Sequence, residues 1–248
     1  MRLTVCQFQA SETVPAERVR RMVSVLDRTE ADVYVFPEMS VTGYVHGDCR
    51  DSLQGCLDAL RGEAEDRGCC IVFGAPGYTD AGEHNCAYAF SDEGAAVYRK
   101  IHLPGFGAFR EDGTYVPGTC PSTFTYRGVC FGLSICYDIF FPELLKWNSM
   151  HGAQVNICIS ASPETSRSAF EKVLPARAIE NTSYLAFSNN IGPSGGLSFF
   201  GGSRILSPLG DLLAIIEGTG TASAELDRGV LMSAREGRPV LRDTVPLE

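Results

Sequence analysis

Short apolar runs alternate with longer amphipathic stretches through the first two thirds of the chain. Short apolar runs are typical of buried strands, whereas apolar residues that recur every three or four positions indicate a helix. One such helical stripe follows Pro15, an accepted first residue of a helix, and consists of Val19, Met22, Val23 and Leu26. The pattern predicts strands over 2–9, 32–36, 69–75, 129–136 and 155–160, two strands within 84–100, and helices from residue 15 and over 51–67, 142–151 and 166–181.

The last third of the chain changes to strands separated by short turns, expected over 184–190, 199–206, 211–216 and 221–227. Pro175 lies within the last helical stretch and is expected to kink that helix or to mark its start. The sequence contains no linker, repeat or low-complexity tract that would divide it. We therefore expect one α/β domain over residues 1–248, with sheets inside and helices outside.

The composition is that of a globular protein with a sizeable core, since 44% of the 248 residues are hydrophobic and 21% are charged. Lys and Arg number 21 against 30 Asp and Glu, which gives a net charge of -9. A general nucleic-acid binder needs a basic face to neutralise phosphates, so this balance argues against nucleic acid as a partner. The sequence lacks an apolar run of about 18 residues, and we expect no membrane partner either.

The ten cysteines are the unusual feature of the composition. Many of them lie in apolar runs, where a free thiol behaves as a small hydrophobic side chain. None are spaced Cys-x-x-Cys, so we expect neither a metal site nor a thioredoxin-like redox motif. The chain opens without a signal-peptide pattern, and these observations together predict a reducing, cytoplasmic compartment. The question is then whether one of the ten thiols is a catalytic group.

Cys136 is the strongest candidate, because it ends the predicted strand 129–136 just before a tight turn and a helix. Such a turn presents a nucleophile, and its backbone N–H groups can bind a developing oxyanion. Position alone still favours one more buried thiol. Two further residues change that balance: Glu38 and Lys100 also follow predicted strands, at the ends where open α/β sheets gather their ligand sites.

These three residue types make chemical sense together. A thiol with a pKa of about 8.5 is mostly neutral at pH 7, so Glu38 can accept its proton as Cys136 attacks a carbon atom. The ammonium group of Lys100 can balance the negative charge that develops on the substrate oxygen. Glu111 is a candidate second carboxylate near the lysine, although a solvated loop charge explains it equally well.

Several segments together carry a resemblance to the nitrilase, or carbon–nitrogen hydrolase, superfamily. They occur in the family's order and at its usual intervals from about residue 2 to residue 227. The segments are 36–38 with 43–44, 98–104, 132–138 with 141–143, 176–181, 200–203 and 208–210. The sequence is therefore identified as resembling this superfamily, and the three-part set of glutamate, lysine and cysteine is its most specific feature.

The resemblance implies a four-layer α-β-β-α sandwich and a Glu–Lys–Cys triad. Glu38 would be the general base, Lys100 the stabiliser of the oxyanion, and Cys136 the nucleophile. Glu111 matches the additional active-site glutamate of the family, and the backbone N–H of Tyr137 would also bind the oxyanion. The family needs no cofactor, and its members form homodimers or higher homo-oligomers through the outer helices.

The predicted function is hydrolysis of a non-peptide carbon–nitrogen bond in a small carboxamide or N-carbamoyl compound, through a thioester on Cys136 and with release of ammonia. Nitrile hydrolysis, acyl transfer by the same triad, and a catalytically silent binding protein on this scaffold are the alternatives. Tyr44, Tyr137 and Phe140 are expected to line the pocket, with ordinary packing as the competing interpretation. Arg177 could meet a substrate carboxylate or, equally well, a helix neighbour such as Glu180.

Two other mechanisms have support in the sequence. Residues 192–196 fit the Gly-x-Ser-x-Gly pattern of serine hydrolases, but no histidine follows them and the next residues do not resemble a helix, so we interpret them as a Gly-rich turn. A Cys–His hydrolase would pair Cys136 with His102 or His151. The stretch 162–168 lacks the tryptophan that many relatives carry there, which together with Pro175 leaves substrate and assembly undefined.

Overall fold

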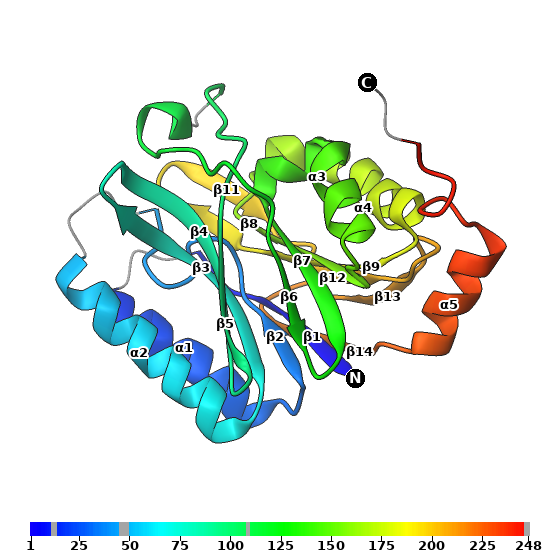
Figure 1. The fold of residues 1–248 in the computed structure, drawn as a ribbon. Helices are drawn as coiled ribbons and strands as arrows, with labels where there is room; N and C mark the ends of the chain where they lie inside the picture. Colours follow the sequence, from blue (N-terminus) through cyan, green and yellow to red (C-terminus); the bar gives the residue numbers. More distant parts are fainter. Residues whose placement is uncertain (11–13, 45–49, 108–109, 246–248) are drawn as a thin grey trace.

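The computed structural model describes residues 1–10, 14–44, 50–107 and 110–245. Two six-stranded sheets face each other, and helices cover the outer face of each sheet (Figure 1). The expected four-layer α-β-β-α sandwich is therefore confirmed.

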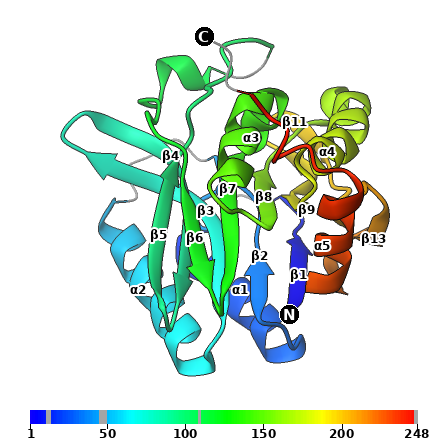
Figure 2. The same ribbon diagram turned by 45° about the vertical axis from the view of Figure 1, so that its right-hand side comes forward.

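The first sheet has the strand order β14-β1-β2-β3-β4-β5. Its strands are β14 (Gly220–Glu225), β1 (Arg2–Gln7), β2 (Val33–Val35), β3 (Cys70–Thr79), β4 (Gly82–Ser91) and β5 (Gly94–Arg99). The strands β1, β2 and β3 run parallel, whereas β14, β4 and β5 pair antiparallel with their neighbours. The helices α1 (Pro15–Arg28) and α2 (Arg50–Arg67) lie side by side over its outer face (Figure 2).

The second sheet has the order β13-β12-β9-β8-β7-β6 and a parallel centre formed by β7, β8 and β9. Its strands are β13 (Leu212–Ile215), β12 (Arg204–Leu206), β9 (Tyr184–Asn189), β8 (Val155–Ser160), β7 (Val129–Ile135) and β6 (Thr123–Tyr126). It is covered by α3 (Pro142–Met150) and α4 (Arg167–Asn181). The remaining elements are the hairpin β10 (Ile191–Ser194) and β11 (Leu197–Phe200), the helix α5 (Arg228–Gly237), and the 3-10 turns η1 (Glu111–Gly113), η2 (Cys136–Phe140) and η3 (Glu164–Ser166).

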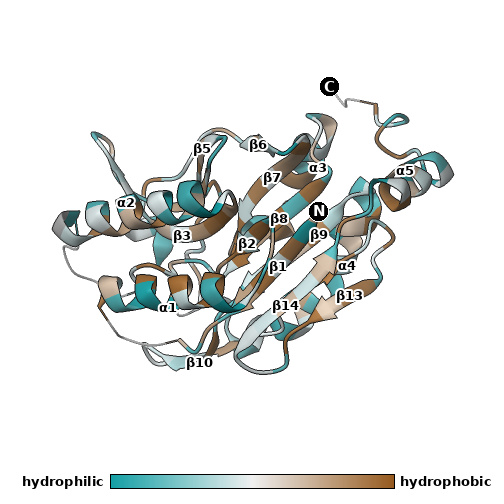
Figure 3. Cartoon of the chain, turned by 90° about the horizontal axis from the view of Figure 1, so that it is seen from below, coloured by the Kyte–Doolittle hydropathy of each residue, from teal (hydrophilic) through white to brown (hydrophobic). Residues whose placement is uncertain are grey.

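The central strands are buried on both faces, and alternate side chains belong to two different clusters. Val33 and Val35 of β2 join the cluster between the sheets, whereas Tyr34 and Phe36 pack in the cluster beneath α1 and α2. Successive side chains of a strand point to opposite faces, which explains the continuous apolar runs in the sequence. Figure 3 shows these strands as largely brown, apolar segments in the interior, while α1 alternates between teal and brown.

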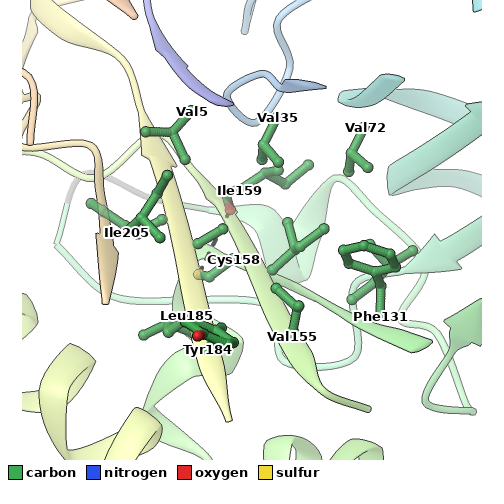
Figure 4. Close-up of a cluster of buried hydrophobic side chains, with 14 of the residues drawn as sticks. Val5, Val35, Val72, Phe131, Val155, Cys158, Ile159, Tyr184, Leu185 and Ile205 are labelled. Carbon is green, nitrogen blue, oxygen red and sulfur yellow. Dashed lines mark hydrogen bonds between the residues drawn. The ribbon is translucent and has the colours of Figure 1, made fainter. Parts of the chain in front are cut away.

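The cluster between the sheets fixes how the two sheets pack on each other. Figure 4 shows Val5, Val35 and Val72 of the first sheet opposite Ile159 and Leu185 of the second, and all five are completely buried. Burial of a side chain of this size contributes about 1.5–3 kcal/mol relative to leaving it exposed. This packing therefore determines the position of every group that follows a strand end.

Several boundaries differ from the sequence-based expectation. The expected single strand over 199–206 is wrong, because its first part belongs to the hairpin β10–β11 and its last part to the second sheet. The segment after residue 227, for which the sequence pattern predicts no element, contains α5, which Asp227 caps by accepting a hydrogen bond from the backbone N–H of Gly229. Pro175 lies inside α4 and does not mark its start.

The buried thiols make the folded state sensitive to alkaline pH. The thiols of Cys6, Cys70, Cys86, Cys136 and Cys158 are free and buried. Burial raises the pKa of Cys86 and of Cys136 to about 12, and it raises the pKa values of Cys6, Cys70 and Cys158 still further. The unfolded chain loses these protons near the ordinary thiol pKa of about 8.5, whereas the folded chain keeps them, so stability falls as pH rises.

We expect each of these five thiols to lower the free energy of unfolding by about 1.4 kcal/mol per pH unit above pH 9, up to its own folded pKa. Urea unfolding followed by circular dichroism at pH 7.5, 9 and 10, with reductant present, measures the effect. Cys70→Ala should make the fall of the unfolding free energy with pH less steep, by about the 1.4 kcal/mol per pH unit that one thiol contributes. A urea midpoint that is the same at pH 7.5 and pH 10 would contradict the prediction.

Candidate active site

Glu38 lies in a tight turn just beyond the end of β2. The next residue, Met39, has a φ of 51°, in the left-handed region. Gly74 of β3 lies directly beneath this turn: a Cβ atom at Gly74 would lie 2.3 Å from the backbone nitrogen of Met39 and 2.7 Å from the Cα atom of Glu38. Glycine at this position therefore lets the Glu38 turn lie against the strand, since any side chain would displace it.

Lys100 follows β5 and lies between two carboxylates. Its Nζ atom lies 2.9 Å from Oε1 of Glu38 and 2.8 Å from Oε2 of Glu111. Lys100 and Glu38 are completely buried, and Glu111 is 5% exposed. Burial alone would lower the pKa of Lys100, but the charges of Glu38 and Glu111 outweigh it and hold that pKa well above its ordinary value. Burial also raises the pKa of Glu111, although Lys100 opposes this shift.

The Glu38 carboxylate is held by further donors from both sheets. Nδ2 of Asn85, on β4, donates to Oε1 at 2.7 Å, and the backbone N–H of Ala161, just beyond β8, donates to Oε2 at 2.8 Å. The Glu38 backbone also donates to the carbonyl of Ser160 at 3.3 Å and accepts from Nδ2 of Asn190 at 3.2 Å. These bonds fix the carboxylate against the second sheet.

Cys136 is the first residue of η2, directly after β7, and has a φ of 50°. This left-handed conformation is unfavourable by about 1–2 kcal/mol for a residue with a Cβ atom, so the surrounding structure must enforce it. Asp138, two residues later and completely buried, does so by accepting the backbone N–H of Ile135 at 3.1 Å and the hydroxyl of Tyr98 at 2.8 Å. It also accepts the backbone N–H of His102 at 3.0 Å, and its Oδ1 lies 2.8 Å from the Nδ1 atom of that residue.

The Cys136 thiol is 9% exposed and neutral in the resting site. Burial and the charge of Glu38 raise its pKa to about 12, against the opposing effects of Lys100 and of the Ser160 and Ser162 hydroxyls. Its Sγ atom lies 3.3 Å from Oγ of Ser162. A base must therefore take the thiol proton before or during attack.

Of the aromatic residues expected to line the pocket, Tyr44 contacts the charged cluster, whereas Tyr137 and Phe140 belong to η2 and pack against other aromatic rings. Tyr44 lies near the charged cluster: its hydroxyl donates to Oε1 of Glu111 at 3.4 Å. Tyr137 lies beside Cys136, and its ring makes an edge contact with Phe106 at 5.1 Å between ring centroids. Phe140, at the end of η2, packs edge-on against Phe170 of α4 at 5.1 Å.

Arg177 lies behind η2 and contacts the protein through three of its nitrogen atoms. Nε donates to the carbonyl of Ile139 at 2.7 Å, Nη2 donates to the carbonyl of Phe140 at 3.2 Å, and Nη1 forms an ion pair with Glu180 at 2.9 Å. Of the two partners that the sequence left open for this guanidinium, Glu180 contacts it in the structure, and contact with a substrate carboxylate stays a prediction.

The alternative mechanisms fare differently in the structure. Nδ1 of His102 bonds to Asp138, and Nδ1 of His151 lies 2.8 Å from the carbonyl of Trp147. The hydrogen-bond partner found for Cys136 is Ser162 and neither histidine. Residues 192–196 lie in the hairpin β10–β11 and its turn, with no helix after Ser194, which confirms the Gly-rich turn.

The side chains of Asn85, Asp138, Ser160 and Ser162 also contact the candidate groups and were not predicted from the sequence. Three of these residues, Asp138, Ser160 and Ser162, stand at or just after strand ends, the same signal that identified Glu38 and Cys136.

Within the described ranges, we find no group of three or more His, Cys, Asp or Glu side chains that could hold a metal ion. In the same part of the chain, no helix is both long and apolar enough to cross a membrane.

The sandwich and the buried cluster of glutamate, lysine and cysteine define a hydrolase of the nitrilase superfamily. The chain matches the carbon-nitrogen hydrolase family over residues 2–236, and it belongs to that family. It is accordingly a hydrolase of carbon–nitrogen bonds other than peptide bonds.

Known proteins similar to this chain include amidases. The 2-oxoglutaramate amidase of Bacillus subtilis (strain 168) is 30% identical, over 97% of this chain and 96% of its own. An (R)-stereoselective amidase of Pseudomonas sp is 31% identical, over 86% of this chain and 80% of its own length. The amidase of Nesterenkonia sp. AN1, solved in complex with butyramide, is 28% identical with a TM-score of 0.84, over 99% of this chain and 97% of that one. Another structure of the same amidase shows covalent addition of the acetamide moiety of fluoroacetamide at the active site cysteine.

Proposed function

We propose that this protein hydrolyses small carboxamides through a thioester on Cys136, with Glu38 as general base and Lys100 as oxyanion stabiliser. The observation that carries the proposal is the buried pairing of Lys100 with both Glu38 and Glu111 beside the Cys136 thiol. A lysine held between two carboxylates stays charged, and a neutral thiol needs a base close by. Both requirements of nucleophilic catalysis are thus met by neighbouring side chains.

Acylation begins as Glu38 accepts the thiol proton and Sγ of Cys136 attacks the carbonyl carbon of the amide. The carbonyl π electrons move to the oxygen, where Lys100 and the backbone N–H of Tyr137 stabilise the negative charge. The N–H groups in the first turn of a helical segment have no acceptor within that segment, so Tyr137 is suited to this role. Glu38 then gives the proton to the leaving nitrogen, ammonia departs, and the acyl group stays on sulfur.

Deacylation repeats these steps with water as the nucleophile. Glu38 takes a proton from water as its oxygen attacks the thioester carbon, and the same groups stabilise the second oxyanion. Collapse of this intermediate releases the carboxylic acid and the Cys136 thiolate, which recovers its proton from Glu38. Each positioned proton transfer contributes about 10²–10⁴-fold to the rate. We assign Glu111 to holding the Lys100 ammonium in place, because it pairs with that group from the other side.

The substrate that we propose is a small amide with an uncharged stem. Tyr44 and Tyr137 supply aromatic walls near the cluster, and Arg177, the cation considered for a substrate carboxylate, already contacts protein groups through Nε, Nη1 and Nη2. The structurally similar Nesterenkonia amidase was solved with butyramide, an amide of this kind. The B. subtilis relative is named for 2-oxoglutaramate, whose carboxylate would need a cationic partner.

An ammonia-release screen tests the proposal. Butyramide, 2-oxoglutaramate, an N-carbamoyl amine and butyronitrile are compared, with Cys136→Ser as the control that keeps the site's shape. We expect butyramide to react fastest and Cys136→Ser to be nearly inactive on every compound. Hydroxylamine added as a competing acceptor should yield a hydroxamate, and a large excess of it over free acid would indicate acyl transfer. Normal turnover by Cys136→Ser would refute the thioester mechanism, and no release from any compound would favour the silent scaffold.

We further propose that residues 1–248 form one domain, that two or more copies assemble, and that the protein works in a reducing compartment such as the cytoplasm. Free, buried thiols support the compartment. The outer helix α3 supports an assembly, because it exposes Trp147 and Met150 by 37% and 46%.

A further inference from the structure

The thiol of Cys136 has a partner outside the Glu–Lys–Cys set. Oγ of Ser162 lies 3.3 Å from Sγ of Cys136, and Oγ of Ser160 lies 2.6 Å from Oγ of Ser162. Both serines are completely buried. Ser162 lies two residues beyond the end of β8. A buried hydroxyl therefore lies against the sulfur atom of the proposed nucleophile.

The two hydroxyls can donate in series toward the sulfur atom. A serine hydroxyl has one proton to donate and two lone pairs to accept with. When Ser162 donates to Sγ, its oxygen is free to accept the proton of Ser160. Hydrogen bonds linked in this way strengthen each other, and a bond to a charged acceptor is about twice as strong as a neutral one. The arrangement therefore suits a thiolate better than a thiol.

The backbone around Ser162 is held firmly in place. Its N–H donates to Oδ1 of Asn189 at 2.8 Å, and Nδ2 of Asn189 donates to the Ser162 carbonyl at 3.3 Å and to the Gly201 carbonyl at 3.0 Å. The preceding residue, Ala161, donates its N–H to the Glu38 carboxylate. The segment Ser160–Ser162 thus contacts the base through its backbone and the nucleophile through its side chains.

We propose that Ser162, supported by Ser160, is a positioning residue that orients the Cys136 sulfur and donates a hydrogen bond to the thiolate. The inference rests on the proposed function of Cys136 as nucleophile. As Glu38 takes the S–H proton, the sulfur lone pair that is left accepts the Ser162 hydroxyl. The new carbon–sulfur bond then uses a sulfur electron pair, the hydrogen bond weakens, and it forms again when deacylation releases the thiolate.

The alkylation of Cys136 by iodoacetamide tests the proposal without requiring amide turnover. The second-order rate constant for each cysteine is measured from pH 6 to pH 10 by peptide mass spectrometry. We compare the native protein with Ser162→Ala, Ser160→Ala and Ser162→Thr, the last of which keeps a hydroxyl. Ser188→Ala is the matched control, because Ser188 is also buried but donates to the backbone carbonyl of Cys6. The exposed Cys120 is an internal reference in every sample.

We expect Ser162→Ala to slow alkylation of Cys136 by about 10- to 100-fold, the range for a lost hydrogen bond to a charged group. Its pH profile should move upward by about one unit or more for the same reason, while Ser160→Ala has a smaller effect in the same direction. Ser162→Thr should recover most of the rate, and Ser188→Ala should match the native protein. In amide hydrolysis, kcat should fall with little change in KM.

The pH profile is read against the other titratable groups that act on Cys136: Glu38, Lys100, Tyr44 and Cys158. None of these is altered by the serine substitutions, so a shift is assigned to the lost hydroxyl. An alkylation rate for Ser162→Ala within twofold of native at every pH, in a protein with a native circular dichroism spectrum, overturns the proposal. Failure of the amide screen with a normal serine effect would instead count against the proposed function alone.

Discussion

Replacement of Lys100 by alanine is expected to abolish amide hydrolysis and to lower the free energy of unfolding by about 3–5 kcal/mol. Lys100 is completely buried between Glu38 and Glu111, at 2.9 Å and 2.8 Å. Without its ammonium group, two carboxylates share a site that is closed to solvent, and at least one of them must bind a proton. The oxyanion also loses the cation that stabilises it. One substitution therefore lowers both the free energy of unfolding and the rate of turnover.

Ammonia release and urea unfolding measure the two effects on the same protein. Lys100→Met, which keeps most of the side-chain volume, provides a second variant in case the alanine protein does not fold. Lys172→Ala is the matched control, because Lys172 is exposed on α4 and donates a hydrogen bond to Ser168. We expect the control to be active and within about 0.5 kcal/mol of native stability. More than a tenth of native activity in both Lys100 variants would contradict the role of Lys100 as oxyanion stabiliser.

The same assay separates this mechanism from a Cys–His hydrolase. Glu38→Gln should be as inactive as the lysine variants. His151→Ala should keep native turnover, since the His151 ring stacks on Trp147 and bonds to its carbonyl at the end of α3. His102→Ala should keep residual turnover, because the ring orients Asp138 but has no bond to the thiol. Essential histidines combined with a dispensable lysine would require a different mechanism.

Replacement of Asp138 by alanine is expected to lower the free energy of unfolding by about 3–5 kcal/mol and to reduce kcat more than it raises KM. The substitution leaves the Tyr98 hydroxyl and the backbone N–H groups of Ile135 and His102 without their acceptor. These donors belong to both segments that carry reacting groups, because Tyr98 and His102 flank Lys100 and Ile135 precedes Cys136. Loss of the carboxylate therefore loosens the nucleophile relative to the lysine.

Asp138→Asn keeps one carbonyl acceptor and should fall between the native protein and the alanine variant in stability and in kcat. The exposed Asp80 supplies the control, as Asp80→Ala should not change the urea midpoint. Thermal and urea unfolding, with steady-state kinetics on the best amide from the screen, check these expectations. A kcat that is unchanged in Asp138→Ala at a temperature where the protein stays folded would show that the carboxylate is structural only.

The central strands and the residues that follow them could be predicted because burial on both faces leaves a strong sequence pattern. Glu38, Lys100 and Cys136 each interrupt or end such a pattern with a polar or reactive group, and the structure brings them into one cluster. The same rule applies to Ser162, which lies two residues beyond β8. Serine and alanine at a strand end also fit an ordinary turn, so the sequence alone does not distinguish the two interpretations.

Other features depend on contacts that no local pattern reveals. Asn85 lies in the middle of β4 and reaches Glu38 only because β3 and β4 pair beside the Glu38 turn. The short helix α5 buries only Leu231 and Ala234, so its apolar stripe is too small to recognise in a polar segment. The contacts of Arg177 with the Ile139 and Phe140 carbonyls depend on how α4 packs on η2.

The proposed base and the proposed nucleophile belong to different sheets, and this division would link catalysis to the register between the two layers. Glu38 and Lys100 follow strands of the first sheet, whereas Cys136 and Ser162 follow strands of the second. A slip of one layer over the other by a single ångström would leave every strand intact but separate the proton acceptor from the sulfur. Heat should therefore inactivate the enzyme before it melts the sheets, and substitutions deep between the layers should alter turnover without touching the site.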